Sequence, residues 1–223
     1  MFENKRLLFI LIIGQCLYGC YTVNNSHHNT APPVNPISNN INITDVIESG
    51  FVRHPEYSNF SICYGHTCQN HAELALAEDE WNKLRAIFNP PARSIEEEHE
   101  QIRAAIALLE TMTGEMTGTS NDKGENFTGM GEDGQMDCVD EATNSSSYLT
   151  MMQADNLLKW HTVDHRVSRG IGSFQVPHFT AMIREKQGGK YFAVDSWFLD
   201  NGEQPFIVPL RVWKKGWRPG DPY

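Results

Sequence analysis

The spacing of apolar residues changes along the chain, and this change limits the fold more than any other sequence feature. Apolar residues recur at three- and four-residue steps from Ala72 to Phe88, where Asn89-Pro90-Pro91 ends the segment. The same spacing recurs from Ser94 to Gly114, and Ser94-Ile95-Glu96-Glu97 has the pattern of a capping box. The spacing therefore predicts two amphipathic helices in the first half of the globular part.

Strand-like runs dominate the second half. A third helix is expected to begin at Asp137 or Cys138, after a polar, glycine-rich loop from Thr113 to Gly134. Gly188-Gly189 is typical of a hairpin turn and separates two of the four runs that follow, which are His161 to Val167, Val176 to Arg184, Tyr191 to Phe198 and Phe206 to Val212. Helices followed by antiparallel strands predict an α+β domain.

The first twenty residues have the pattern of an export signal. Lys5-Arg6 precedes an apolar run from Leu7 to Gly14, which is far shorter than the roughly 20 residues that a membrane-spanning helix needs. The run leads to Leu17-Tyr18-Gly19-Cys20, which resembles the lipobox of bacterial lipoproteins, whose cysteine sulfur carries diacylglycerol. Residues 1–19 are therefore predicted to be a signal peptide and Cys20 to be lipidated. The alternative is an ordinary signal peptide in which Cys20 is incidental.

Residues 20–46 are rich in Asn, Ser, Thr and Pro, and this composition predicts a flexible tether. A single α+β domain is expected over residues 47–223. Because Tyr21 and not aspartate follows the lipobox cysteine, the resemblance to lipoproteins implies attachment to the periplasmic face of the outer membrane.

The charge distribution argues against nucleic acid as a partner. The 223 residues include 18 basic and 28 acidic side chains, for a net charge of −10, and they contain no lysine- or arginine-rich run. Phosphate backbones and anionic membrane surfaces attract basic patches, so this chain is expected to meet a membrane only through its lipid anchor.

Three reactive residues follow one another in a suggestive order. Cys138 lies where a helix is expected to begin, and the unpaired N–H groups there favour a thiolate and can hold an oxyanion. His178 begins one strand and Asp195 lies in the next, so the Gly188-Gly189 hairpin is expected to bring them within side-chain reach. Asp195 would then fix the imidazole tautomer while the other ring nitrogen accepts the cysteine proton.

This arrangement resembles the catalytic core of transglutaminase-like cysteine enzymes, which belong to the papain-like superfamily. Asp195-Ser196-Trp197 is also similar to the Asn-Ser-Trp of papain-type proteases. The resemblance covers residues 135–198 and implies a papain-like fold, with Cys138 as nucleophile, His178 as general base and acid, and Asp195 as the orienting residue. Gln135 is a further candidate oxyanion donor. No cofactor and no metal is expected.

Each of the three residues also has a structural interpretation. Cys138 could be a buried helix cysteine that packs as a small hydrophobe, His178 a strand-end histidine, and Asp195 a turn or salt-bridge acid. The acids Asp137 and Asp140 would also oppose ionisation of the thiol.

The remaining cysteines and histidines are expected to be structural. Cys63 and Cys68 lie five residues apart, and in an oxidising compartment a local disulfide is the simplest interpretation. A zinc site of Cys63, His66, Cys68 and His71, or a pair of free thiols, stays open as an alternative. His161 and His165 alternate on a predicted strand and are expected to face solvent together.

The leading functional hypothesis is a cell-envelope cysteine hydrolase or acyltransferase that cleaves amide bonds through a thioester. Its substrate would be a peptide, a protein or a peptidoglycan stem peptide. The alternative is a non-catalytic envelope lipoprotein that uses a papain-like scaffold for binding or assembly.

Overall fold

The computed structural model describes residues 52–127, 129, 131–172 and 176–223, all within the unit Ile41–Tyr223. The predicted signal peptide, Cys20 and the predicted tether lie outside the described residues. Among the helices that are described, none combines the length and the apolar character needed to cross a bilayer.

A four-stranded antiparallel sheet forms the second half of the domain, in the order β3-β4-β5-β6. Its strands are β3 (His161–Arg169), β4 (His178–Glu185), β5 (Tyr191–Asp195) and β6 (Phe206–Pro209). All four predicted runs form strands, and Gly188-Gly189 lies in the turn between β4 and β5, where Gly189 has a φ of +65°. The last run is shortened because the chain turns into the short helix α5 (Leu210–Trp213).

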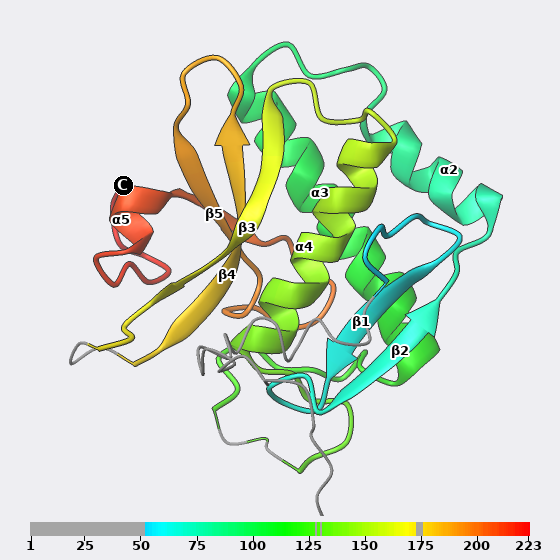
Figure 1. Cartoon of the computed structure of the whole chain (residues 1–223), viewed down its shortest axis with the longest axis vertical. Coiled ribbons are helices and arrows are strands. Elements are labelled where there is room, and N and C mark those ends of the chain that lie inside the picture. The colour runs from blue at the N-terminus through cyan, green and yellow to red at the C-terminus, as the bar shows by residue number, and fades with distance from the viewer. Residues whose placement is uncertain (1–51, 128, 130, 173–175) are drawn as a thin grey trace, which may run out of the picture. The chain divides into compact units, whose positions relative to one another are not determined.

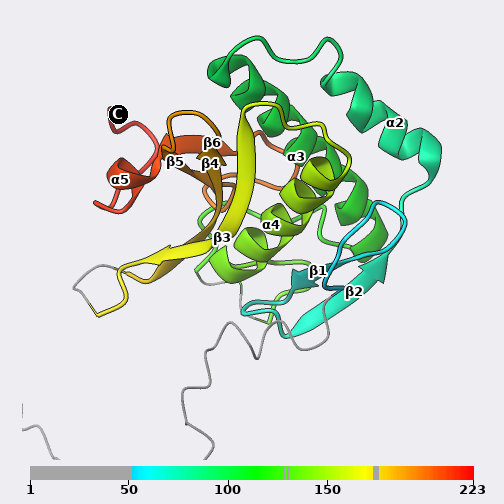
Figure 2. The same cartoon turned by 45° about the horizontal axis from the view of Figure 1, so that its top comes forward.

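Helix α4 (Cys138–Ala154) lies between this sheet and a small N-terminal hairpin, with α3 (Ile95–Thr117) behind it (Figures 1 and 2). The predicted Ser94 cap is present, and Asp137 caps α4 in a similar way. The Ser94 hydroxyl accepts the N–H of Glu97, and the Asp137 carboxylate accepts the N–H groups of Val139 and Asp140. Both helices therefore begin where the sequence places polar capping residues.

The first predicted helix is wrong in its N-terminal part. Strands β1 (Phe60–Tyr64) and β2 (Asn70–Leu74) form a two-stranded antiparallel sheet, and helix α2 (Glu78–Ile87) begins only after them. Ala72, Leu74 and Leu76 are two residues apart, so their spacing suits a strand as well as a helix. The pairing with β1 decides between the two. The part of the chain that the structure describes is α+β, with four helices and two antiparallel sheets.

Two hydrophobic clusters lie on opposite faces of the large sheet. Side chains of β5 alternate, so Phe192 and Val194 join the main core beneath the helices, while Ala193 joins the second cluster on the other face. We call this second group the tryptophan cluster; its buried members are Ala193, Trp197, Phe198, Val208, Trp213 and Trp217. Asp195 continues the alternation of Ala193 and faces the same side.

Candidate active site

His178 and Asp195 form a buried pair on the tryptophan-cluster side of the sheet. His178 Nε2 lies 2.7 Å from Asp195 Oδ2, and the indole N–H of Trp213 donates to the same oxygen over 2.6 Å. Both members are almost fully buried. The β4–β5 register places Val194 opposite Ala181, so His178 and Asp195 are diagonal neighbours on one face, two residues out of direct opposition.

Aromatic rings enclose the His178 imidazole. Ring centroids of Trp197, Phe198 and Trp213 lie 4.8, 5.4 and 5.5 Å from it. The Arg169 guanidinium lies 4.5 Å from the Trp213 ring and donates to the Trp213 carbonyl, which holds that indole in place. The enclosure excludes water from the histidine and limits its rotation.

Cys138 is the first residue of α4, is half-buried and packs against the tryptophan cluster. The backbone N–H of Phe179, the residue that follows His178, is near enough to lower the pKa of the thiol, so the thiol lies beside the start of β4. Burial raises the pKa of the Cys138 thiol to about 12, and the charges of Asp137 and Asp195 add to this while the Phe179 N–H opposes it. The expected lowering of this pKa by the helix N-terminus is therefore outweighed, and the resting thiol keeps its proton.

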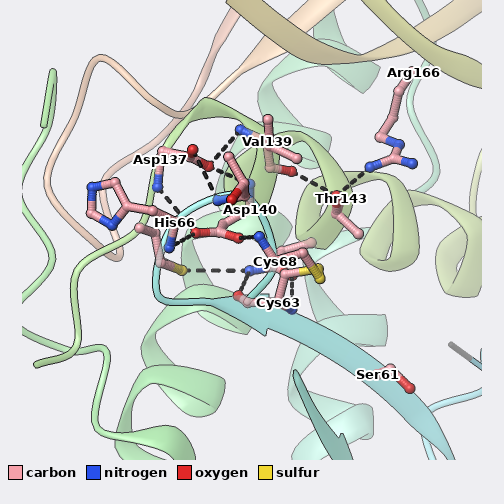
Figure 3. Close-up of a disulfide and its surroundings, with 12 residues drawn as sticks. Ser61, Cys63, His66, Cys68, Asp137, Val139, Asp140, Thr143 and Arg166 are labelled. Carbon is pink, nitrogen blue, oxygen red and sulfur yellow. Dashed lines mark hydrogen bonds between the residues drawn. A yellow bond between two sulfur atoms is a disulfide. The ribbon is translucent and has the colours of Figure 1, made fainter. Parts of the chain in front are cut away.

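The acids next to Cys138 hold the turn of the β1–β2 hairpin (Figure 3). Asp140 accepts the backbone N–H groups of His66 and Cys68, over 2.7 and 2.6 Å, and Asp137 accepts that of Thr67 over 2.9 Å. His66, Thr67 and Cys68 all have positive φ angles, so three consecutive N–H groups can face the carboxylates. The acids thus fasten the hairpin to the start of α4, a role that the sequence pattern does not reveal.

Cys63 and Cys68 form the predicted disulfide, which closes this turn. Asn144 of α4 adds two hydrogen bonds to the backbone of Cys63, over 2.6 and 2.8 Å. Among the described residues, the only three possible metal ligands that cluster, with ligand atoms within 4.8 Å of one another, are Cys63, Cys68 and Asp140, without His66 or His71. Because the two sulfurs are bonded to each other, the zinc alternative does not describe this state of the protein.

A group of buried carboxyls lies near Ser196, the residue that follows Asp195. Burial raises the pKa of Glu110 to about 8 and that of Asp122 to about 7, and it raises the pKa of Glu141 well above its ordinary value. The Ser196 side chain lies near enough to Glu110 and Glu141 to oppose this rise in both pKa values, and its hydroxyl hydrogen-bonds to that of Ser145 over 2.9 Å. Apolar periodicity treats acids as surface residues, so sequence analysis misses this group. A sequence signal for the burial of Glu110 is its position on α3, one helical turn after the buried Ile106.

Gln135 is buried, and its amide holds the loop before α4. Its Nε2 donates to the Asn121 carbonyl over 2.9 Å, and its Oε1 accepts the Asn126 side-chain amide. Its assignment as an oxyanion donor stays a prediction.

The expectation that His161 faces solvent is wrong. His161 is fully buried and its Nδ1 lies 2.9 Å from Glu98 Oε1, whereas His165 is exposed as predicted. The β3–β4 register shifts between Asp164 and Val167, and this irregularity interrupts the alternation that would place both histidines on one face.

Cys138, His178 and Asp195, which we call the triad, come from α4, β4 and β5 and lie on one side of the sheet. Comparison with known proteins finds no matching family model, no matching curated protein and no matching solved structure. What the triad can do chemically follows from its own residues and their geometry.

Proposed function

We propose that the protein is a cysteine hydrolase or acyltransferase of the transglutaminase-like, papain-like type that acts on amide bonds. The observation that carries the proposal is the buried His178–Asp195 pair beside the Cys138 thiol. Asp195, which the Trp213 indole N–H holds in place, binds one imidazole nitrogen, Nε2, so the other nitrogen, Nδ1, is left to accept a proton.

The high pKa of Cys138 requires that proton transfer accompany nucleophilic attack. His178 Nδ1 takes the thiol proton as the sulfur bonds to the substrate carbonyl carbon, and Asp195 stabilises the resulting imidazolium. The imidazolium then gives this proton to the leaving amine, and a thioester remains on Cys138. Water or a second amine attacks the thioester with His178 again as base, which releases the acyl product and restores the thiol.

Two groups are placed to stabilise the tetrahedral intermediate. The Trp197 indole N–H lies beside His178, is buried and has no hydrogen-bond partner among the described residues. The second is the backbone N–H of Cys138 itself, because the N–H groups of Val139 and Asp140 are already bonded to the Asp137 carboxylate. A substrate carbonyl bound between them would give the indole N–H its missing acceptor.

The cellular setting follows from the N-terminal sequence. We propose an exported lipoprotein whose substrate is a peptide, a protein or a peptidoglycan stem peptide of the cell envelope. The disulfide of the described domain suits an oxidising compartment of this kind.

One observation favours a second candidate function, that of a non-catalytic binding module on the same scaffold. Burial and neighbouring charges keep the Cys138 thiol protonated, and such a thiol is a poor nucleophile unless a base assists it. The two functions therefore differ in whether His178 activates Cys138.

Acylation of the full-length protein in detergent by p-nitrophenyl acetate separates these two functions. We expect a burst of nitrophenolate and an acetyl group on Cys138, detected by mass spectrometry. The His178→Gln variant should acylate at least 100-fold more slowly, and the matched control His165→Gln should equal the parent. A Cys138 that is not acylated, or one whose rate is indifferent to His178→Gln, overturns the enzyme proposal.

A further inference from the structure

Two histidines meet at the end of the sheet that lies away from the triad. The β3–β4 register pairs His161 with Glu185 at this end and Arg169 with His178 at the other. Here the Nε2 atom of His161 lies 3.2 Å from the Nε2 atom of His99 on α3. The two rings are stacked, with centroids 4.8 Å apart and planes inclined by 29°.

A buried carboxylate fixes the tautomer of His161. Glu98 is fully buried, and besides the His161 ring it accepts the backbone N–H groups of Lys159, Trp160 and His161. An ionised Glu98 can only accept hydrogen bonds, so His161 Nδ1 must donate to it. The lone pair of His161 then lies on Nε2, which faces His99.

His99 completes the pair from a more accessible position. It is only partly buried, and the edge of its ring meets Phe192 with centroids 4.7 Å apart. Burial, with His161 next in importance, lowers the pKa of His99 to about 4, so the ring is neutral at neutral pH. A neutral imidazole can offer the lone pair of Nε2 when it carries its proton on Nδ1.

We propose that His99 and His161 bind a divalent transition-metal ion such as Zn²⁺ through their Nε2 atoms, with Glu98 as the carboxylate that orients His161. Two imidazole nitrogens that are each 2.0–2.1 Å from a tetrahedral zinc lie about 3.4 Å apart, close to the separation seen here. A carboxylate on the far nitrogen of a ligating histidine is the usual support for such a ligand. Binding moves the His99 proton from Nε2 to Nδ1.

The ion would link α3 to the first residue of β3 and leave coordination positions for water. Glu96 lies three residues before His99 on α3 and is exposed. Its carboxylate is therefore on the same side of the helix as His99 and is a candidate for a further ligand. The site shares no residue with the triad. Its occupancy therefore does not depend on the proposed enzymatic activity.

Isothermal titration of the full-length protein in detergent with Zn²⁺, without reductant, tests the proposal. His27→Gln, His28→Gln and Cys138→Ala form the background, because these residues are other possible zinc ligands. We expect one Zn²⁺ to bind and to raise the midpoint of thermal unfolding. His99→Gln should weaken binding at least tenfold and remove this rise, while the matched control His165→Gln on β3 should bind as the background protein does.

His99→Gln is the decisive variant because His99 is partly exposed, whereas His161→Gln would leave buried Glu98 without its ring partner and could unfold the chain. Circular dichroism checks that His99→Gln is folded. Absence of zinc binding by the background protein overturns the proposal, and so does equal binding by a folded His99→Gln variant. The pair would then be a hydrogen bond between two imidazoles.

Discussion

A histidine–carboxylate pair lies at each end of the β3–β4 ladder, and the two pairs have different surroundings. At one end His178 meets Asp195 over 2.7 Å, and at the other His161 meets Glu98 over 2.9 Å. Glu98 also accepts three backbone N–H groups, whereas Asp195 accepts an indole N–H and has a buried oxygen, Oδ1, without a partner among the described residues.

The neighbours of each histidine decide its chemistry. His178 has a thiol beside it and is suited to move a proton, while His161 faces a second imidazole and is suited to share a lone pair. A histidine–carboxylate pair alone therefore does not identify a catalytic site. The predictions that follow separate the two ends of the ladder.

The largest effect is expected from Asp195→Asn. The asparagine amide can donate to Nε2 and so favour the wrong tautomer of His178, which should slow acylation of Cys138 by about 10²–10⁴-fold. The burst of nitrophenolate from p-nitrophenyl acetate measures the rate. A rate within threefold of the parent would mean that the two carboxylates have the same, structural role.

A strong pH dependence of stability is expected from the buried carboxyls near Ser196. The pKa values of Glu110 and Asp122 are about 8 and about 7 in the folded protein, well above their ordinary values, so the folded state binds these protons more tightly than the unfolded chain does. Their contribution is fully present below the unfolded pKa values near 4, and it is lost as the pH rises through 7 to 8.

Urea unfolding at pH 5, 7 and 9 measures this loss, which we expect to reach several kcal/mol. Glu110→Gln keeps the shape of the side chain without a titrating proton and should flatten the pH profile. An unfolding free energy that rises from pH 5 to pH 9 in the parent, or a profile unchanged in Glu110→Gln, contradicts the assignment.

A smaller effect, on stability alone, is expected from Glu98→Gln. The amide can accept fewer of the hydrogen bonds that converge on Glu98, so the free energy of unfolding should fall by about 1–3 kcal/mol. The rate of Cys138 acylation should stay within twofold of the parent, because Glu98 lies at the other end of the ladder. Denaturant unfolding and the burst assay measure the two quantities. A large loss of acylation rate in a folded variant would mean that the Glu98 end of the ladder also contributes to the reactivity of Cys138.

An effect of similar size on stability is expected from the double variant Cys63→Ser, Cys68→Ser. Loss of a disulfide that closes so short a loop should lower the unfolding free energy by about 2 kcal/mol. The turn fastens the start of α4, so acylation should slow a few-fold while zinc binding at His99 stays unchanged. Weakened zinc binding in the folded variant would show that the two ends are coupled.

Much of the fold is predictable because local signals agree with tertiary structure. Ser94 and Asp137 mark the starts of α3 and α4, and Gly188-Gly189 marks the turn that brings His178 near Asp195. The β1–β2 hairpin is missed because the spacing of Ala72 and Leu74 suits two periodicities. Only pairing with a distant strand chooses between them.

The pKa values of the site residues are less predictable from the sequence than the identities of those residues. The helix start suggests a lowered pKa for Cys138, but burial dominates, and burial is a property of the assembled fold. The same applies to Glu110 and Glu141, and to His161, which is buried against Glu98 and His99 of α3. Sequence patterns identify residue types in order, whereas the dielectric environment of each residue depends on long-range packing.

The hydrogen bond from Trp213 to Asp195 has a consequence for biosynthesis. Trp213 belongs to α5, which follows every other described element along the chain, yet its indole N–H holds the oxygen that orients His178. A nascent chain therefore carries Cys138, His178 and Asp195 before it can assemble them. Under the function that we propose, the base that would activate Cys138 is therefore not fully oriented until α5 has emerged and folded back.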